Sequence, residues 1–256
     1  MKISINTTIV IFTLVLLTSC KEIFRKDQSL TPAQYAVQGM PAWNKTWTEQ
    51  DFTKANFALS SIRMKNFYIL PRKNSSRSAP MFNRIISKEN FTFLEDASIP
   101  LADKAYRIQT LGNFMGQLGT FYNDKLRAQQ YYGDELVEIY ATHLFVRGKM
   151  LELAENINNS TRQEDIAMQS GRNGIVGSYV FLLTFLVSEE KKPEAFSSGQ
   201  LKTLNMEMAH SLSNNIKYLD SLSKQKLSAE IRKLYENNKS VSARKEIDEM
   251  LKFLSE

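Results

Sequence analysis

Apolar residues recur every three or four positions over most of the chain, and this spacing limits the possible folds more than any other feature. The longest run has apolar residues at 201, 204, 208, 212, 216, 219 and 222. Such spacing places the side chains on one face of an α-helix, which must be buried against a partner. The 256 residues include only 10 Gly and 6 Pro, which argues against a fold rich in β-turns. We therefore expect an all-α protein.

Signals for the ends of helices divide this pattern into segments. Ser197 with Gln200, and Thr46 with Glu49, have the spacing of a capping box at a helix start. The Ser-rich, basic stretch 71–80 predicts a loop, and Phe91 to Leu94 suggests a short extended piece. No repeat of fixed period is present, so we expect a single helical bundle of about five to seven helices. The expected helices cover residues 46–62, 98–126, 134–153, 161–188, 197–234 and 241–254.

The first twenty residues have the composition of an export signal. A short positive start, Met1-Lys2, precedes an apolar run from Ile9 to Leu17, and small residues follow. This run is shorter than the roughly 20 apolar residues that a membrane-spanning helix needs. The pattern therefore predicts a secretory signal peptide.

The end of this segment, Leu17-Thr18-Ser19-Cys20, resembles the lipobox of bacterial lipoproteins. The resemblance implies cleavage before Cys20, which is the only cysteine, and attachment of acyl chains such as palmitate to its sulfur. Lys21-Glu22 is similar to the start of the surface-export signal of Bacteroidota lipoproteins, but the acidic run ends at Ile23. Both the periplasmic face of the outer membrane and the cell surface therefore remain open. An uncleaved anchor, or a plain secretory signal with a buried Cys20, is the alternative.

These features predict three parts of the chain. Residues 1–19 form the lipoprotein signal peptide, and residues 20–45 contain the lipidated Cys and a tether that lacks clear periodicity. Residues 46–256 form the α-helical domain.

Two features of the helical pattern concern packing. The run from Ile175 to Val187 is apolar almost throughout, which favours a central core helix over a membrane span. Six glycines fall within expected helices, where each costs about 1 kcal/mol relative to Ala. They indicate either close packing between the two helices that carry them or a face beside a ligand. These glycines are Gly112, Gly116, Gly119, Gly171, Gly174 and Gly177.

Signatures of catalysis and metal binding are weak. The chain has two histidines, His143 and His210, which excludes a site with three histidine ligands. Glu207 and His210 have the Glu-x-x-His spacing of di-iron bundles, but Tyr140 stands where the second pair would need its Glu. The sequence contains no nucleophile elbow, zinc-protease motif or phosphate-binding loop. We therefore expect no catalytic residues, no metal and no cofactor.

Charge gives the clearest indication of function. The span from Phe52 to Lys88 contains eight basic residues and no acidic residue. Its charge of +8 exceeds the net charge of +6 of the whole chain. Aromatic residues are interleaved with them, a composition suited to anionic headgroups, acidic glycans or an acidic protein. A solvated loop that only aids solubility is the alternative. The candidate residues for an anionic partner are Lys54, Arg63, Lys65, Arg72, Lys73, Arg77, Arg84 and Lys88.

From these observations we predict a membrane-anchored helical lipoprotein of the cell envelope that acts as a binding or accessory protein and is not an enzyme. Its expected partners are the membrane, through the lipid, and an anionic envelope component or protein. Nucleic acid is not an expected partner of an exported protein. Two alternatives remain: a hydrolase acting on the envelope near His143 or His210, and a carrier of an apolar ligand beside the glycine faces.

Overall fold

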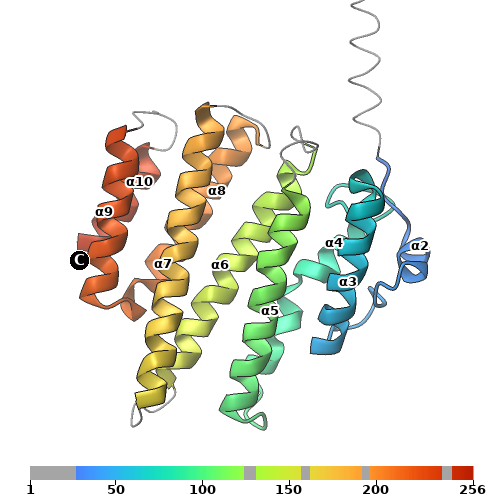
Figure 1. The fold of residues 1–256 in the computed structure, drawn as a ribbon, viewed down its shortest axis with the longest axis horizontal. Coiled ribbons are helices and arrows are strands. Elements are labelled where there is room, and N and C mark those ends of the chain that lie inside the picture. Colours follow the sequence, from blue (N-terminus) through green and yellow to red (C-terminus); the bar gives the residue numbers. More distant parts are fainter. Residues whose placement is uncertain (1–26, 124–130, 157–161, 192–195, 238–243, 256) are drawn as a thin grey trace, which may run out of the picture.

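The protein is an all-α bundle, as the apolar spacing predicts (Figure 1). The computed structural model describes residues 27–123, 131–156, 162–191, 196–237 and 244–255. Nine α-helices and no β-strand lie within these ranges. The number exceeds five to seven because two short helices, α2 (Pro32–Val37) and α4 (Ala79–Ile86), fall in stretches expected to be irregular. In addition, the helix expected at 197–234 divides into α8 and α9.

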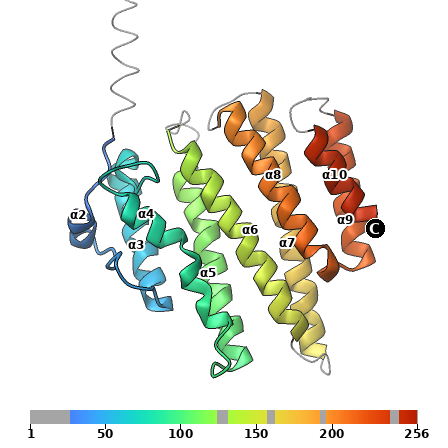
Figure 2. The same cartoon turned by 180° about the vertical axis from the view of Figure 1, so that it is seen from behind.

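The long helices form two layers, seen from opposite sides in Figure 1 and Figure 2. One layer contains α3 (Glu49–Lys65), α5 (Leu101–Tyr122), α7 (Arg162–Lys191) and α9 (Ser221–Asn237). The other contains α4, α6 (Gly133–Asn156), α8 (Ser198–Asn215) and α10 (Arg244–Ser255). Helix α6 packs on α5, α7 and α8, whereas α5 and α7 make little direct contact with each other. Helix α6 is therefore the centre of the bundle. Three short 3₁₀ helices connect the elements: η1 (Phe67–Ile69), η2 (Lys88–Leu94) and η3 (Ile216–Tyr218).

Capping residues set where these helices begin. The predicted box at the start of α8 is confirmed, because the Ser197 hydroxyl accepts from the Gln200 N–H and the Gln200 side chain accepts from the Ser197 N–H. The box predicted at Thr46 and Glu49 is wrong. Helix α3 instead uses Thr48 and Asp51, because the extended backbone of Thr48 places its hydroxyl at the first turn. The extended piece predicted at 91–94 is also wrong, since these residues belong to η2.

Residues 27–45, which we assigned to a tether, pack on the helical body. The Tyr35 side chain is fully buried, and its hydroxyl donates a hydrogen bond of 2.7 Å to the Ile69 carbonyl. Thr31 and Gln34 form a complete capping box at the start of α2. The described part of this segment is therefore continuous with the body, because an aromatic side chain and buried hydrogen bonds fix it there.

Helix α7 is not the central helix that its apolar run predicts. Ile175, Tyr179 and Leu182 are buried, but Gly177 is exposed and Phe181 keeps 57 % of its surface exposed. Because the bundle has only two layers, the face of α7 that points away from α6 and α8 opens to solvent. None of the helices within the described residues is long and apolar enough to cross a membrane.

Candidate functional site

The predicted lipidation site, Cys20, lies outside the described residues, as does the whole predicted signal peptide. The eight predicted basic residues all lie within them. Three are on α3, three are in the loop between η1 and α4, one is on α4 and one begins η2. The structure therefore shows which of these eight cations are exposed and available to bind a partner.

Three of the eight residues form ion pairs with carboxylates in the described part of the chain. Arg72 lies 3.7 Å from the Glu135 carboxylate, and Arg84 pairs with Glu89 at 2.9 Å. Lys73 pairs with the carboxylate of Glu138. These cations are occupied by carboxylates of the same chain, so they are poor candidates for a partner.

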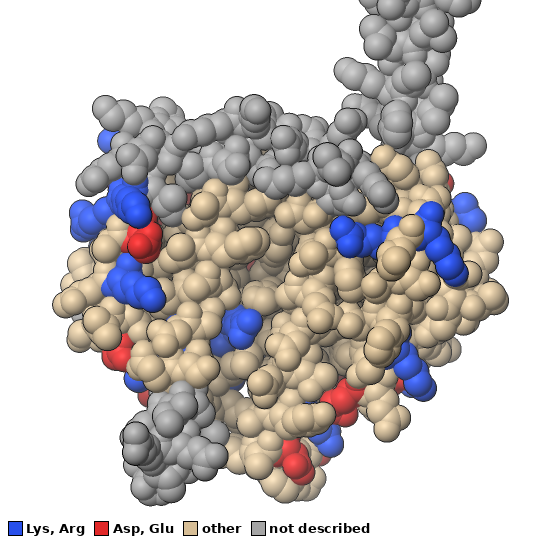
Figure 3. Space-filling model, viewed as in Figure 1, with Lys and Arg blue, Asp and Glu red and all other residues tan. Residues whose placement is uncertain are grey.

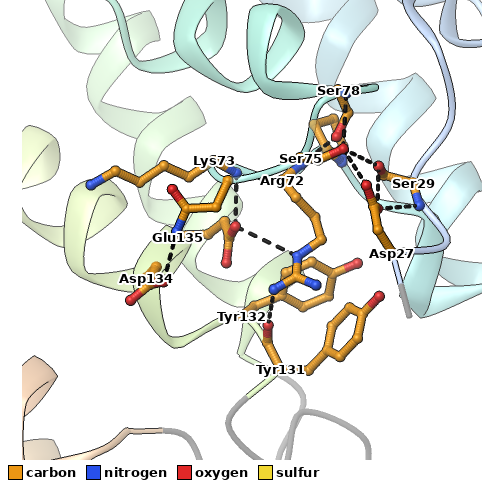
Figure 4. A network of polar contacts seen from close by, with 12 residues as sticks. Asp27, Ser29, Arg72, Lys73, Ser75, Ser78, Tyr131, Tyr132, Asp134 and Glu135 are labelled. Carbon is orange, nitrogen blue, oxygen red and sulfur yellow. Dashed lines mark hydrogen bonds and ion pairs between the residues drawn. The ribbon is translucent and has the colours of Figure 1, made fainter. Parts of the chain in front are cut away.

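Arg72 is the centre of a polar network between the loop and α6 (Figure 4). Its guanidinium donates to the Tyr131 carbonyl at 2.9 Å and lies 4.3 Å from the centre of the Tyr131 ring. The facing carboxylate, Glu135, is fully buried and accepts the Lys73 N–H at 2.7 Å. Burial raises the pKa of Glu135, and the charge of Arg72 opposes this effect. Arg72 therefore serves as the counter-charge of a buried acid.

The same network fixes the start of the described chain (Figure 4). Asp27 accepts hydrogen bonds from the Ser29 N–H at 2.9 Å and from the hydroxyls of Ser29 and Ser75. Burial would raise the pKa of Asp27, but these hydrogen bonds outweigh it and lower the pKa. Ser78 accepts the Arg72 N–H at 2.9 Å and completes the loop. Residue 27 is thus held directly against the basic loop.

Four of the predicted cations are exposed and free of ion pairs with described residues: Lys54, Lys65, Arg77 and Lys88. Among the described residues, the side chains of Lys65 and Arg77 donate to the side-chain oxygens of Gln38 and Gln34. Figure 3 shows Lys and Arg side chains gathered over the α3 end of the molecule, with few Asp or Glu side chains beside them. The remaining residue of the eight, Arg63, is half-buried on α3.

The six glycines do not bring α5 and α7 together, as the close-packing interpretation expected. Both glycine faces instead lie against α6. A Cβ at Gly112 would meet Met150 and Val146, at Gly119 it would meet Tyr140, and at Gly171 it would meet Leu151. Gly116 and Gly174 lie beside His143 and Arg147, whereas a Cβ at Gly177 would have nothing within 4 Å. Three of the six therefore serve close packing, and the other three border open space or polar side chains.

A groove lies between α6 and α8, two helices of the layer nearer the viewer in Figure 2. Its volume is about 530 Å³, and its walls carry both Lys149 with Glu152 and Glu207 with His210. Lys149 and Glu152 form an ion pair of 2.7 Å. His210 contacts Asn214 at 3.2 Å and forms no ion pair with a described carboxylate. The lining also includes Ser211, whose hydroxyl contacts Tyr179 Oη at 2.9 Å and Asn215 Nδ2 at 3.2 Å. No hydrogen bond among the described residues joins Ser211 to His210 or to Glu207, so the hydrolase alternative stays a prediction.

The described residues contain no group of three or more His, Cys, Asp or Glu placed to hold a metal ion. Two features of the structure were not found by sequence reasoning. The first is the Asp27–Ser75–Arg72–Glu135 network, whose members come from three separate parts of the sequence. The second is the half-buried Arg147, one turn after His143 on α6, and this spacing was the available signal.

No known protein family, curated protein or solved structure matches this chain.

Proposed function

We propose that this chain is a lipid-anchored helical protein of the bacterial cell envelope, acting as a binding or accessory protein for an anionic partner. The observation that carries the proposal is the position of Asp27. It binds the loop that carries Arg72, Lys73 and Arg77, and it follows Cys20 by only seven residues.

Covalent geometry limits how far the body can lie from such an anchor. Seven residues span at most about 25 Å when fully extended. The basic loop would therefore remain near the membrane surface, where each exposed Lys or Arg gains about 1 kcal/mol beside anionic lipid. Two or three acyl chains, at about 0.8 kcal/mol per buried methylene, would hold the protein there.

The exposed cations define which residues would face the partner. Lys54, Lys65, Arg77 and Lys88 have no carboxylate partner among the described residues, so binding an anion costs no existing ion pair. Arg72, Lys73 and Arg84 would instead support the fold. Arg63 is half-buried, so the eight predicted residues are narrowed to the four exposed ones.

The anchor is tested by mass spectrometry of the protein isolated from its own cells. The expected product begins at Cys20 and carries acyl chains on that residue, and it fractionates with membranes. The Cys20→Ala variant should remain unprocessed at this site. An unmodified thiol at Cys20, or an intact leader in the wild-type protein, would refute the proposal.

The anionic partner is tested separately with an unlipidated chain that begins at residue 21. It should float with vesicles containing phosphatidylglycerol and not with phosphatidylcholine alone. The triple variant Lys54→Glu, Lys65→Glu, Arg77→Glu should lose this binding. A matched triple variant at the exposed residues Lys202, Lys226 and Lys252 changes the net charge equally and should keep most of it. Equal loss in both triples would show that only net charge matters.

A further inference from the structure

A hollow opens between α5 and α7 on the face opposite the α6–α8 groove. Helices α5 and α7 both pack on α6 and barely touch each other. Figure 3 shows this face hollowed near its centre, with a basic side chain inside the hollow and little charge around it. The side chains of α6 that lie beneath the two outer helices here are His143 and Arg147.

Glycines keep this hollow open. A Cβ at Gly116 of α5 would meet only the His143 ring, at 3.6 Å, and one at Gly174 of α7 would meet Arg147 at 3.4 Å. A Cβ at Gly177 would meet nothing within 4 Å. Larger residues at these positions would occupy the space above the two polar side chains.

Arg147 is a half-buried cation without a carboxylate partner in the described part of the chain. Its Nε donates to His143 Nε2 at 3.3 Å, and one terminal nitrogen lies 3.9 Å from Met150 Sδ. Burial and then the charge of Arg147 lower the pKa of His143 to about 4, so the imidazole is neutral at pH 7. The cluster therefore carries a single positive charge, located on Arg147. Removing a cation from water without a counter-charge is costly, and an anion in the hollow would offset this cost.

The surroundings of the cluster indicate the chemistry of that anion. Ser178 lies 3.5 Å from His143 Nε2 and could turn its hydroxyl toward a ligand, although it now donates to the Gly174 carbonyl at 2.8 Å. One turn further along the same face of α7, exposed Phe181 stacks on Phe185 with ring centres 6.3 Å apart. The hollow thus combines one fixed cation with an aromatic edge. A guanidinium fork matches a carboxylate in shape, and a single charge balances a monoanion.

We propose that the hollow between α5 and α7 binds the carboxylate of a small apolar molecule, with Arg147 as its counter-charge and the Phe181 side of α7 against its apolar part. This site is distinct from the basic surface near the anchor and does not depend on the lipid at Cys20. The test of this site and the tests of the anchor and the basic surface therefore have independent outcomes.

The proposal is tested by titration calorimetry of the full chain, purified in a non-ionic detergent, with hexanoate as the probe. Hexanol serves as the uncharged probe and hexyl phosphate as the dianionic one. Hexanoate should bind more tightly than either. Arg147→Gln should weaken hexanoate about tenfold or more, the factor expected on losing a hydrogen bond to a charged group. Arg232→Gln, which changes an exposed arginine on α9, should leave the affinity unchanged.

A second variant covers the case in which Arg147→Gln does not fold. Gly177→Leu fills the hollow from an exposed helical position, so it should fold at least as well as the wild type and still lose hexanoate binding. Gly199→Leu places the same residue at another open glycine, on α8, and should bind hexanoate normally. Equal affinities for hexanoate and hexanol, tighter binding of hexyl phosphate, or full affinity in folded Gly177→Leu would each overturn the proposal.

Discussion

Gly148 of α6 is the position where a single methyl group gives the sharpest test of the packing. A Cβ there would lie 2.5 Å from Asn215 Oδ1 and 2.9 Å from Asn215 Nδ2, closer than real side chains approach. Asn215 is buried at the end of α8, and its amide donates to the hydroxyls of Tyr179 and Ser211 at 3.3 and 3.2 Å. We therefore expect Gly148→Ala to displace the amide and break both hydrogen bonds.

The magnitude follows from two opposing effects. Replacing a helical Gly by Ala stabilises a helix by about 1 kcal/mol. Losing two hydrogen bonds of about 0.5 to 1.5 kcal/mol each removes about 1 to 3 kcal/mol. Gly148→Ala should therefore be neutral or destabilising by up to about 2 kcal/mol, and the thermal midpoint falls by about 2 to 4 °C per kcal/mol in a chain of this size.

A double-mutant cycle removes the ambiguity of the small net effect. With Asn215 already replaced by Ala, the added methyl group meets no amide, so Gly148→Ala should raise the thermal midpoint. The coupling between the two changes should then be about 1 to 3 kcal/mol in circular-dichroism melts. Gly177→Ala, with nothing within 4 Å of the new methyl group, is the control and should stabilise either background. Additivity within about 0.5 kcal/mol would refute the predicted contact between α6 and α8.

Three further predictions concern other parts of the body. Tyr35→Phe removes the hydrogen bond from a fully buried side chain to the Ile69 carbonyl and should destabilise the protein by about 1 to 3 kcal/mol. It should also speed proteolysis within residues 27–45, and an unchanged cleavage rate would contradict the docking of that segment. Burial alone would raise the pKa of Asp51, but hydrogen bonds from Lys45 and Thr48 outweigh it and lower the pKa. The contribution of Asp51 to folding stability should be complete above its usual pKa of 3.8 and be lost as the pH falls through the lowered pKa. The thermal midpoints of the wild type and of Asp51→Asn should therefore converge at that low pH. For His143, burial favours the neutral form. Its pKa in the folded protein is about 4, below the ordinary 6.5, so the imidazole is protonated in the unfolded chain at a higher pH than in the folded one. Stability should fall from pH 6.5 toward 4 in the wild type and less in His143→Gln, whereas parallel profiles would show that the imidazole is not buried as described.

The helices could be predicted because their signals are local. The spacing of Leu201, Leu204, Met208 and Leu212 marks one face of α8, and Ser197 marks its first turn, all within sixteen residues. The packing partners of these faces could not be predicted in the same way. The apolar run of α7 indicates burial but does not distinguish a central helix from an outer one.

The sites were harder to predict because their contacts join distant parts of the chain. The basic span has no acidic residue of its own, but Arg72 and Lys73 meet Glu135 and Glu138 across more than sixty residues. No local sequence pattern indicates such pairs, so the number of unpaired cations was overestimated from the sequence. The burial of Tyr35 was missed for a different reason, because a six-residue helix shows too little periodicity to reveal its buried side.

Helix α6 connects the two proposed binding surfaces through its own geometry. Glu135 in its first turn holds the loop that binds Asp27, and Arg147 follows twelve residues later, about 18 Å along the helix axis. A body held by Cys20 would keep the Glu135 end nearer the membrane, because Asp27 binds there. The hollow at Arg147 would then lie further out along the same rigid helix, where a soluble ligand can reach it. One helix would thus separate attachment from ligand binding, and variants at the two ends should affect the two processes independently.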